Sequence, residues 1–126
     1  MSGFNTNLEK DTLANTYFRN VIFTAPHSQL VLMALQPNED IGMEVHKNED
    51  QFFRVEKGTG KAILDGVEYV LQDGSCVVIP AGTLHNIINT SSRDLLQVYT
   101  IYSPAHHPQG RLNVTKADAI AEEERK

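Results

Sequence analysis

The strongest constraint on the fold lies between residues 20 and 102, where short apolar runs alternate with turn residues and no stretch spaces its apolar residues as a helix would. The clearest local signal is "AILDGVEYV", in which Asp65-Gly66 separates two alternating runs and suits a type I′ turn. Many short strands with Gly, Pro and Asn turns favour a sandwich or barrel over βαβ units. We therefore expect an all-β fold.

The expected strands are residues 20–24, 29–36, 43–47, 51–57, 60–65, 67–72, 76–80, 85–89 and 95–102. Outside them, "LEKDTLAN" predicts a short turn of helix. A short C-terminal helix is predicted in "TKADAIAEEERK", where Thr115 and Asp118 have the spacing of a capping box. We expect a single domain over 1–126, with a barrel at about 17–103 and a C-terminal loop and helix at 104–126.

Composition excludes several functional classes. The chain of 126 residues carries a formal charge of -5, from 16 acidic and 11 basic residues, and has no run of Lys or Arg that would neutralise phosphates. We therefore expect no nucleic-acid partner. No apolar run approaches the roughly 20 residues of a membrane-spanning helix, and the start has no secretory pattern. We expect a cytoplasmic protein with no membrane partner.

Cys76 is the only cysteine in the sequence. A lone cysteine excludes an internal disulfide framework and a zinc site built from several cysteines. Because it lies in the apolar stretch "GSCVVIP", we expect it to be a small buried side chain rather than a nucleophile.

The candidate chemistry begins in "GMEVHKNEDQFFRVEKG", residues 42–58. Glu44 and His46 are two residues apart and so project from the same side of a strand. After a turn at 47–50, Gln51 is expected to open the next strand and to face that pair across a hairpin. His85 begins a later strand, and in a closed barrel it would point into the same interior.

At these positions the chain resembles a small single-domain cupin. The second cupin motif is glycine, five residues, proline, one residue, glycine, two residues, histidine, three residues, asparagine. It is matched in full by Gly74, Pro80, Gly82, His85 and Asn89.

The first cupin motif, which contains His-x-His and a later glutamate, is matched with substitutions. His46 takes the place of the second histidine and Gly58 that of the closing glycine. Glu44 stands where the first histidine is usual, and Gln51 where the glutamate is usual. The opening glycine is displaced, because Gly42 lies only one residue before Glu44.

A closer resemblance, over most of the chain, is to cupins that share Glu-x-His and Asp-Gln-Phe-Phe-Arg, and these are often labelled mannose-6-phosphate isomerase-like. The resemblance implies a jelly-roll barrel, or double-stranded β-helix, and a homodimer formed through the N-terminal strands. It also implies a divalent metal ion held by Glu44, His46, Gln51 and His85.

Two imidazoles, one carboxylate and one amide oxygen would leave a divalent ion with a net charge of about +1 and with open coordination positions. Such a donor set suits Zn, Mn, Fe, Ni or Co. We expect a metalloenzyme that isomerises or tautomerises a polar small molecule, a sugar derivative or a hydroxy or keto acid, by Lewis-acid chemistry. Glu44 is the expected general base.

Two alternatives stay open. Two histidines with one carboxylate are similar to the donor set of Fe(II)-dependent dioxygenases. The barrel could also serve as a non-catalytic module that binds a small ligand. His106 and His107 lie in the Pro-bounded loop "YSPAHHPQG", which in the resembled subgroup follows the barrel, and their role is left open.

Overall fold

The structure is a computed structural model and describes residues 2–124. The elements are α1 (Leu8–Ala14), β1 (Arg19–Thr24), β2 (Gln29–Leu35), β3 (Asp50–Lys57), β4 (Gly60–Leu64), β5 (Val67–Leu71), β6 (Cys76–Ile79), β7 (His85–Asn89), β8 (Leu96–Ser103), β9 (Leu112–Asn113) and α2 (Lys116–Glu124). The predicted all-β class and the predicted short C-terminal helix are confirmed.

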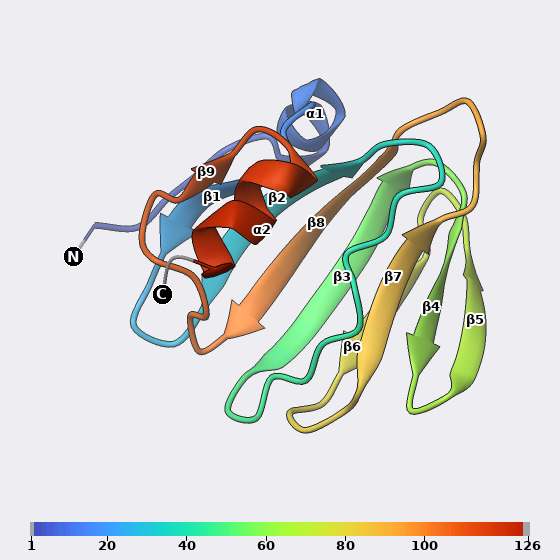
Figure 1. Cartoon of the computed structure of the whole chain (residues 1–126). Helices are drawn as coiled ribbons and strands as arrows, with labels where there is room; N and C mark the ends of the chain where they lie inside the picture. The colour runs from blue at the N-terminus through green and yellow to red at the C-terminus, as the bar shows by residue number, and fades with distance from the viewer. Residues whose placement is uncertain (1, 125–126) are drawn as a thin grey trace.

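The strands form two antiparallel sheets that face each other (Figure 1). The larger sheet has the order β6-β3-β8-β2-β1-β9, and the smaller has the order β5-β4-β7. Neighbouring strands are distant in sequence, as in β3 beside β8 and β4 beside β7. This crossed connection is that of a jelly-roll β-sandwich, so the predicted architecture is also confirmed.

The core lies between the sheets and follows the two-residue period of the strands. In β3 the buried side chains are those of Gln51, Phe53 and Val55, whereas the residues between them are only partly covered. Gln51 therefore points inward on the same face as two core residues. The fully buried aliphatic residues around them include Val31, Met33, Leu35, Ile79, Ile87, Leu96 and Val98.

The hairpin predicted from Asp65-Gly66 forms between β4 and β5. Both residues have positive φ, 47° and 84°, as a type I′ turn requires. Leu64 pairs with Val67 across the turn. The Asp65 carboxylate also accepts a hydrogen bond from the Leu84 backbone N–H at 3.0 Å, which ties the turn to the loop before β7.

The strand expected at 43–47 does not form. Instead the segment runs beside β7 with two isolated bridges, Asp40 to Ile88 and Glu44 to His85. Between the two bridges the chain advances four residues in this segment but only three in β7. The segment therefore contains one residue more than the strand it pairs with. Gly42, with φ 108°, lies within this bulge, and its N–H donates to the Asn86 side chain. The extra residue interrupts the ladder and prevents a regular strand.

The expected hairpin between 43–47 and the strand of Gln51 is also wrong. Gln51 lies opposite Ile79 of β6 on one side and Tyr102 of β8 on the other. The partner of Glu44 is instead His85, through backbone hydrogen bonds of 2.8 and 2.9 Å. The two halves of the candidate site are therefore joined directly by the backbone.

The prediction that Cys76 is buried is wrong. Cys76 is exposed because it opens β6, the edge strand of the larger sheet, on the outward side of the pleat. The apolar neighbours that suggested burial alternate between the two faces, and Val78 is exposed as well.

The C-terminal segment folds back over one end of the sandwich. The short strand β9, which was not predicted, pairs with β1 through Arg19 and Asn113. The Thr115 hydroxyl then caps α2 by accepting the Asp118 N–H at 3.1 Å. In Figure 1 this helix, in red, lies in front of β1 and β2. Within residues 2–124, no helix is long and apolar enough to cross a membrane.

Candidate metal centre

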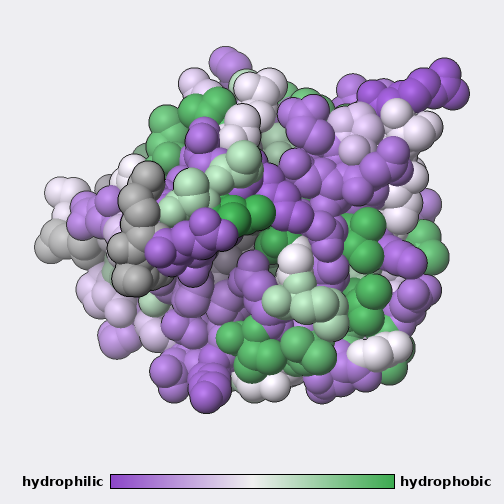
Figure 2. Space-filling view, in the orientation of Figure 1, coloured by the Kyte–Doolittle hydropathy of each residue, from purple (hydrophilic) through white to green (hydrophobic). Residues whose placement is uncertain are grey.

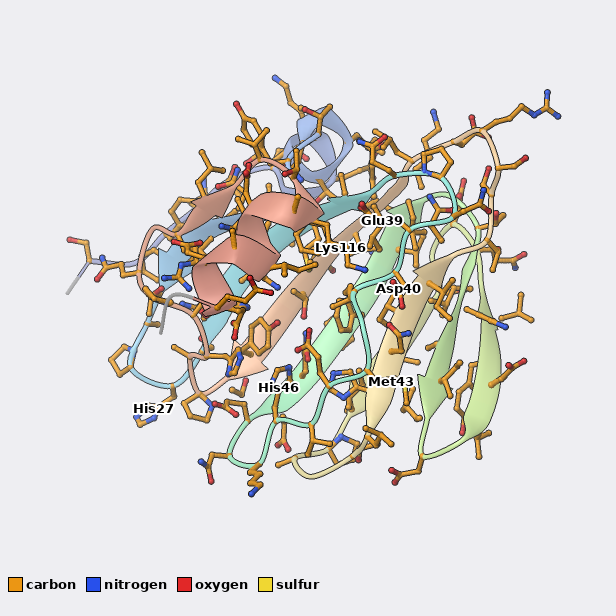
Figure 3. All side chains as sticks on the ribbon, in the orientation of Figure 1. His27, Glu39, Asp40, Met43, His46 and Lys116 are labelled. Carbon is orange, nitrogen blue, oxygen red and sulfur yellow. The ribbon has the colours of Figure 1, made fainter. Side chains whose placement is uncertain are left out.

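Three potential ligands converge where the 40–46 segment meets β7. One ligand atom from each of Glu44, His46 and His85 lies within 4.8 Å of the others. Glu44 and His46 come from the irregular segment, and His85 is the first residue of β7. Figure 3 shows His46 on the inner side of this segment, near the lower end of β8. Glu44 and His46 therefore lie close together even though their segment does not form a regular strand.

His46 is 6% exposed, and its Nε2 is 2.9 Å from Oε2 of Glu44. The alignment is not that of a hydrogen bond, and Nε2 has no hydrogen-bond partner. A buried nitrogen left without a partner is costly. An imidazole nitrogen and a carboxylate oxygen at this distance can both contact one bound cation.

His85 is oriented for ligation by its own loop. Its Nδ1 lies 2.9 Å from the Thr83 carbonyl oxygen, which can only accept, so Nδ1 carries the proton. Nε2 is left with a free lone pair, as in most histidines that bind metals. Burial lowers the pKa of His85, which keeps the ring neutral.

The Glu44 side chain is a carboxylate near neutral pH. Burial acts to raise its pKa, but His46, Arg19 and His85 outweigh burial, and the pKa is lowered from the usual 4.5. One anionic oxygen donor therefore stands beside the two imidazoles.

Gln51, the fourth predicted ligand, is 2% exposed. Its Nε2 donates a 3.0 Å hydrogen bond to the Thr100 hydroxyl, whereas its Oε1 has no hydrogen-bond partner. An amide whose nitrogen is fixed and whose buried oxygen is unpaired has the oxygen available as a ligand. The two unpaired atoms, His46 Nε2 and Gln51 Oε1, fit a divalent ion bound among these donors.

The remaining residues of the second motif shape the backbone around this cluster. Gly82, with φ 86°, donates its N–H to the His46 carbonyl at 2.9 Å and so fixes the loop before β7 against the candidate ligand. The Asn89 side chain donates to the carbonyls of Leu35, Gln36 and Asp94. Asn89 therefore holds the end of β7 in place and is not a ligand.

A cavity of about 390 Å³ opens beside the cluster. Its walls come from β1, the 41–46 segment, the 106–107 loop and α2, and the lining residues are Phe18, Arg19, Ile41, Glu44, Val45, His46, His106, His107, Lys116, Ala119, Ile120 and Glu123. Its size suits a small metabolite. Hydrophilic and hydrophobic residues are interspersed over the face of the molecule shown in Figure 2.

His106 and His107, whose role the sequence left open, both line this cavity. The His106 ring lies 4.1 Å from the His46 ring, and its Nδ1 is 3.2 Å from Glu49. His46, Glu49 and His106 thus form a second cluster of ligand atoms within 4.8 Å of one another. His107 Nε2 is 3.2 Å from the Tyr102 hydroxyl, and burial lowers the His107 pKa to about 2. His27 is exposed on the β1–β2 loop, away from His46 (Figure 3).

Sequence reasoning missed Arg19 and Gln29. Gln29, which is fully buried, accepts the N–H groups of His106 and His107 and donates to the His107 carbonyl at 2.7 Å. Its partners are 77 and 78 residues away, and Asn113 is 94 residues from Arg19. No local pattern in the sequence signals such contacts.

Comparison with known proteins identifies the family. The family described as "Cupin domain" matches residues 31–102. The chain belongs to the cupin family. This cupin is 52% identical over 113 residues to the mimivirus protein named "Uncharacterized protein L612" (Acanthamoeba polyphaga mimivirus), a match covering 87% of this chain and 71% of that protein. It is 42% identical over 127 residues to YrkC of Bacillus subtilis (strain 168), covering 96% and 68%.

Among solved structures, this cupin is similar to BH2720 from Bacillus halodurans, with 40% identity, a TM-score of 0.92 and 95% of each chain covered. The family match includes the four predicted ligands. It does not include several cavity residues at the two ends of the chain, namely Phe18, Arg19, His106, His107 and Lys116. The family therefore accounts for the barrel and the cluster, whereas the rest of the cavity wall is added by the flanking segments.

Proposed function

We propose that this cupin is a metalloenzyme that binds a divalent ion through Glu44, His46, His85 and the amide oxygen of Gln51. The observation that carries the proposal is the convergence of three ligand atoms within 4.8 Å, with His46 Nε2 and Gln51 Oε1 buried and unpaired. Four protein donors leave one or two positions open, which is typical of catalytic rather than structural sites. The mixed nitrogen and oxygen donors suit Zn, Mn, Fe, Ni or Co.

The proposed reaction is the isomerisation or tautomerisation of a polar small molecule. A bound divalent ion would supply Lewis acidity toward a carbonyl or hydroxyl group. Glu44, held as a carboxylate, accepts a proton from the carbon next to that group and returns it to the neighbouring atom. Burial raises the pKa of Tyr102, so its hydroxyl stays protonated beside His107.

An Fe(II)-dependent dioxygenase is the second candidate, and the donor composition of the cluster favours it, since Glu44, His46 and His85 are two histidines and one carboxylate. Oxygen uptake by the Fe(II)-loaded protein in the presence of a catechol, thiol or keto acid would support it. Turnover of a hydroxy or keto acid without oxygen uptake would support the isomerase instead.

Elemental analysis of the purified protein tests the metal proposal. We expect a stoichiometric divalent metal in the wild type and less than about a tenth of that occupancy in Glu44→Ala and His85→Ala, because removing a ligand weakens binding by more than the about 10–100-fold seen for supporting residues. Gln51→Ala should lose part of the metal. His27→Ala, a change on an exposed loop, should lose none.

His106→Ala separates the two overlapping clusters, because His106 belongs only to the second one. It should retain the metal while His85→Ala loses it. The reverse result would place the ion between His46, Glu49 and His106. A wild type that holds no metal, and that no divalent ion stabilises against heat, would leave a non-catalytic binding module as the function.

A further inference from the structure

Arg19 is a charged group buried in the wall of the candidate cavity. It is the first residue of β1 and is 7% exposed. Its guanidinium carbon stands 5.4 Å from the centre of the Phe18 ring, and Nη1 donates a 3.3 Å hydrogen bond to Asn113. Nε is buried and has no hydrogen-bond partner. Most of the donor capacity of this side chain is thus unused.

Within residues 2–124, no carboxylate lies at ion-pair distance from Arg19, whereas Arg54 and Arg111 each have one, in Glu56 and Glu122. Buried charges in proteins are nearly always paired, because a lone charge loses its hydration without compensation. A buried guanidinium that faces a cavity and lacks an acid is therefore a site for an anion from outside the chain.

The second cation of the cavity wall is already neutralised. Lys116 of α2 contacts the Asp40 carboxylate at 2.7 Å, and Figure 3 shows the two side chains meeting between α2 and the 39–43 segment. Arg19, in contrast, lines the same cavity as the candidate metal ligands Glu44 and His46. A molecule in this cavity can therefore contact both Arg19 and the Glu44–His46 pair.

We propose that Arg19 binds the carboxylate of the substrate while another oxygen of the same molecule reaches the metal position. The substrate class is then a small hydroxy or keto acid rather than a neutral sugar derivative. The planar fork of donors on arginine matches an oxyanion in two-point contact, and a phosphate would be bound by the same chemistry. This inference rests on the proposed function for the second contact, but anion binding by Arg19 does not require the metal.

Calorimetric titration of three small probes tests the assignment: lactate, inorganic phosphate and 1,2-propanediol, which is lactate with the carboxylate replaced by an alcohol. Each is titrated into the protein with its retained metal and after treatment with a chelator. We expect lactate to bind both forms, more tightly with metal, and the diol to bind at least about tenfold more weakly. Tighter binding of phosphate than of lactate would assign the site to a phosphate ester and overturn the hydroxy-acid assignment.

The matched variants are Arg19→Met, which keeps the length of the side chain, Arg19→Lys, which keeps the charge, and Arg93→Met, which makes the same change on an exposed loop. Arg19→Met should lower lactate affinity by about 10–100-fold without reducing metal content, as expected for lost charged hydrogen bonds. Arg19→Lys should lie between it and the wild type. Arg93→Met should bind lactate as the wild type does.

Equal lactate affinity in Arg19→Met and the wild type, equal affinity for lactate and the diol, or no binding of either anion would each overturn the proposal. If Arg19→Met also loses metal, the test passes to Arg19→Lys. The proposal then requires that Arg19→Lys keeps the metal and binds lactate more weakly than the wild type. A protein without metal that binds lactate through Arg19 would contradict the proposed metal function and support the anion site. A protein that binds metal but neither anion would support the proposed metal function and contradict the anion site.

Discussion

At the scale of single residues, the candidate site contains buried polar atoms that have no hydrogen-bond partner within the protein. Thr100 fixes the nitrogen of Gln51 and Thr83 fixes the Nδ1 of His85, so that in both side chains the remaining electron-pair donor is directed elsewhere. Such second contacts are the usual means of orienting metal ligands. In the proposed site, the contact with Thr100 leaves the Gln51 oxygen unpaired at the position where the first cupin motif usually has a glutamate.

Replacing Gln51 with glutamate should make stability depend strongly on metal. Gln51→Glu places a carboxylate at a buried position, so the metal-free protein should lose about 1–3 kcal/mol of its free energy of unfolding. A bound divalent ion should restore this loss and bind more tightly than in the wild type. Urea unfolding with and without saturating metal measures both effects.

Gln97→Glu is the matched control, because Gln97 is also buried and its amide donates to the Leu13 and Asn15 carbonyls, away from the site. Gln97→Glu should be destabilised to a similar degree, and a divalent ion should not restore its free energy of unfolding. Equal effects of metal on the two variants would show that Gln51 does not face the ion.

At this scale, the sequence indicates candidate residues where spacing carries the information. The four candidate ligands were found because they occupy motif positions, and three of them meet in space. Arg19 and Gln29 were missed because their importance arises from partners far along the chain, brought together only by the fold. The burial of Cys76 was predicted wrongly because an edge strand leaves one face uncovered.

At the scale of elements, α2 is tied to the segment that carries Glu44 and His46. Asp40 accepts from Lys116 at 2.7 Å and from Asn86 at 2.9 Å, and so joins the helix to both the segment and β7. The same helix provides one wall of the cavity. The position of α2 therefore affects how closed the site is.

This tie should depend on pH in a defined direction. The Lys116 hydrogen bond, followed by that of Asn86, lowers the pKa of Asp40 below its usual 3.8. A carboxyl group with a lowered pKa in the folded state stabilises the fold above its unfolded pKa, and the effect is lost as the pH falls through the folded value. Asp40→Asn should therefore be less stable than the wild type at pH 5–7, and this difference should shrink as the pH falls below about 3.8, toward the lower folded pKa.

Thermal unfolding of both proteins across this range measures the difference, and it should be small because the Asp40 side chain is partly exposed. Asp94→Asn, on an exposed loop, provides the comparison for nonspecific charge effects. A stability difference for Asp40→Asn that persists unchanged at pH 3 would contradict the assigned role of the carboxylate.

Elements were predicted well where turn chemistry is local and less well where pairing is not. The turn at Asp65-Gly66 follows from two residues that tolerate positive φ. The 43–47 segment alternates like a strand, but the bulge around Gly42 breaks its pairing with β7. β9 has only two residues, too few to show a strand pattern in the sequence. Its pairing with β1 depends on the C-terminal segment folding back onto that strand.

At the scale of the molecule, the candidate ligands come from both layers of the sandwich. Gln51 lies in the larger sheet, His85 in the smaller sheet, and Glu44 and His46 in the connection between β2 and β3. A bound ion would thus join the two sheets at one end of the barrel. The predicted homodimer through the N-terminal strands stays a prediction, and the size of the protein in solution would test it.

The most direct test of the central claim is a crystal structure of the protein with its retained metal, with the metal located by anomalous diffraction. The account predicts one anomalous peak at about 2.0–2.2 Å from the Glu44 carboxylate, from His46 and from His85, with the Gln51 oxygen as a further neighbour. A peak between His46, Glu49 and His106, or a fully loaded crystal whose metal lies outside both clusters, would contradict it.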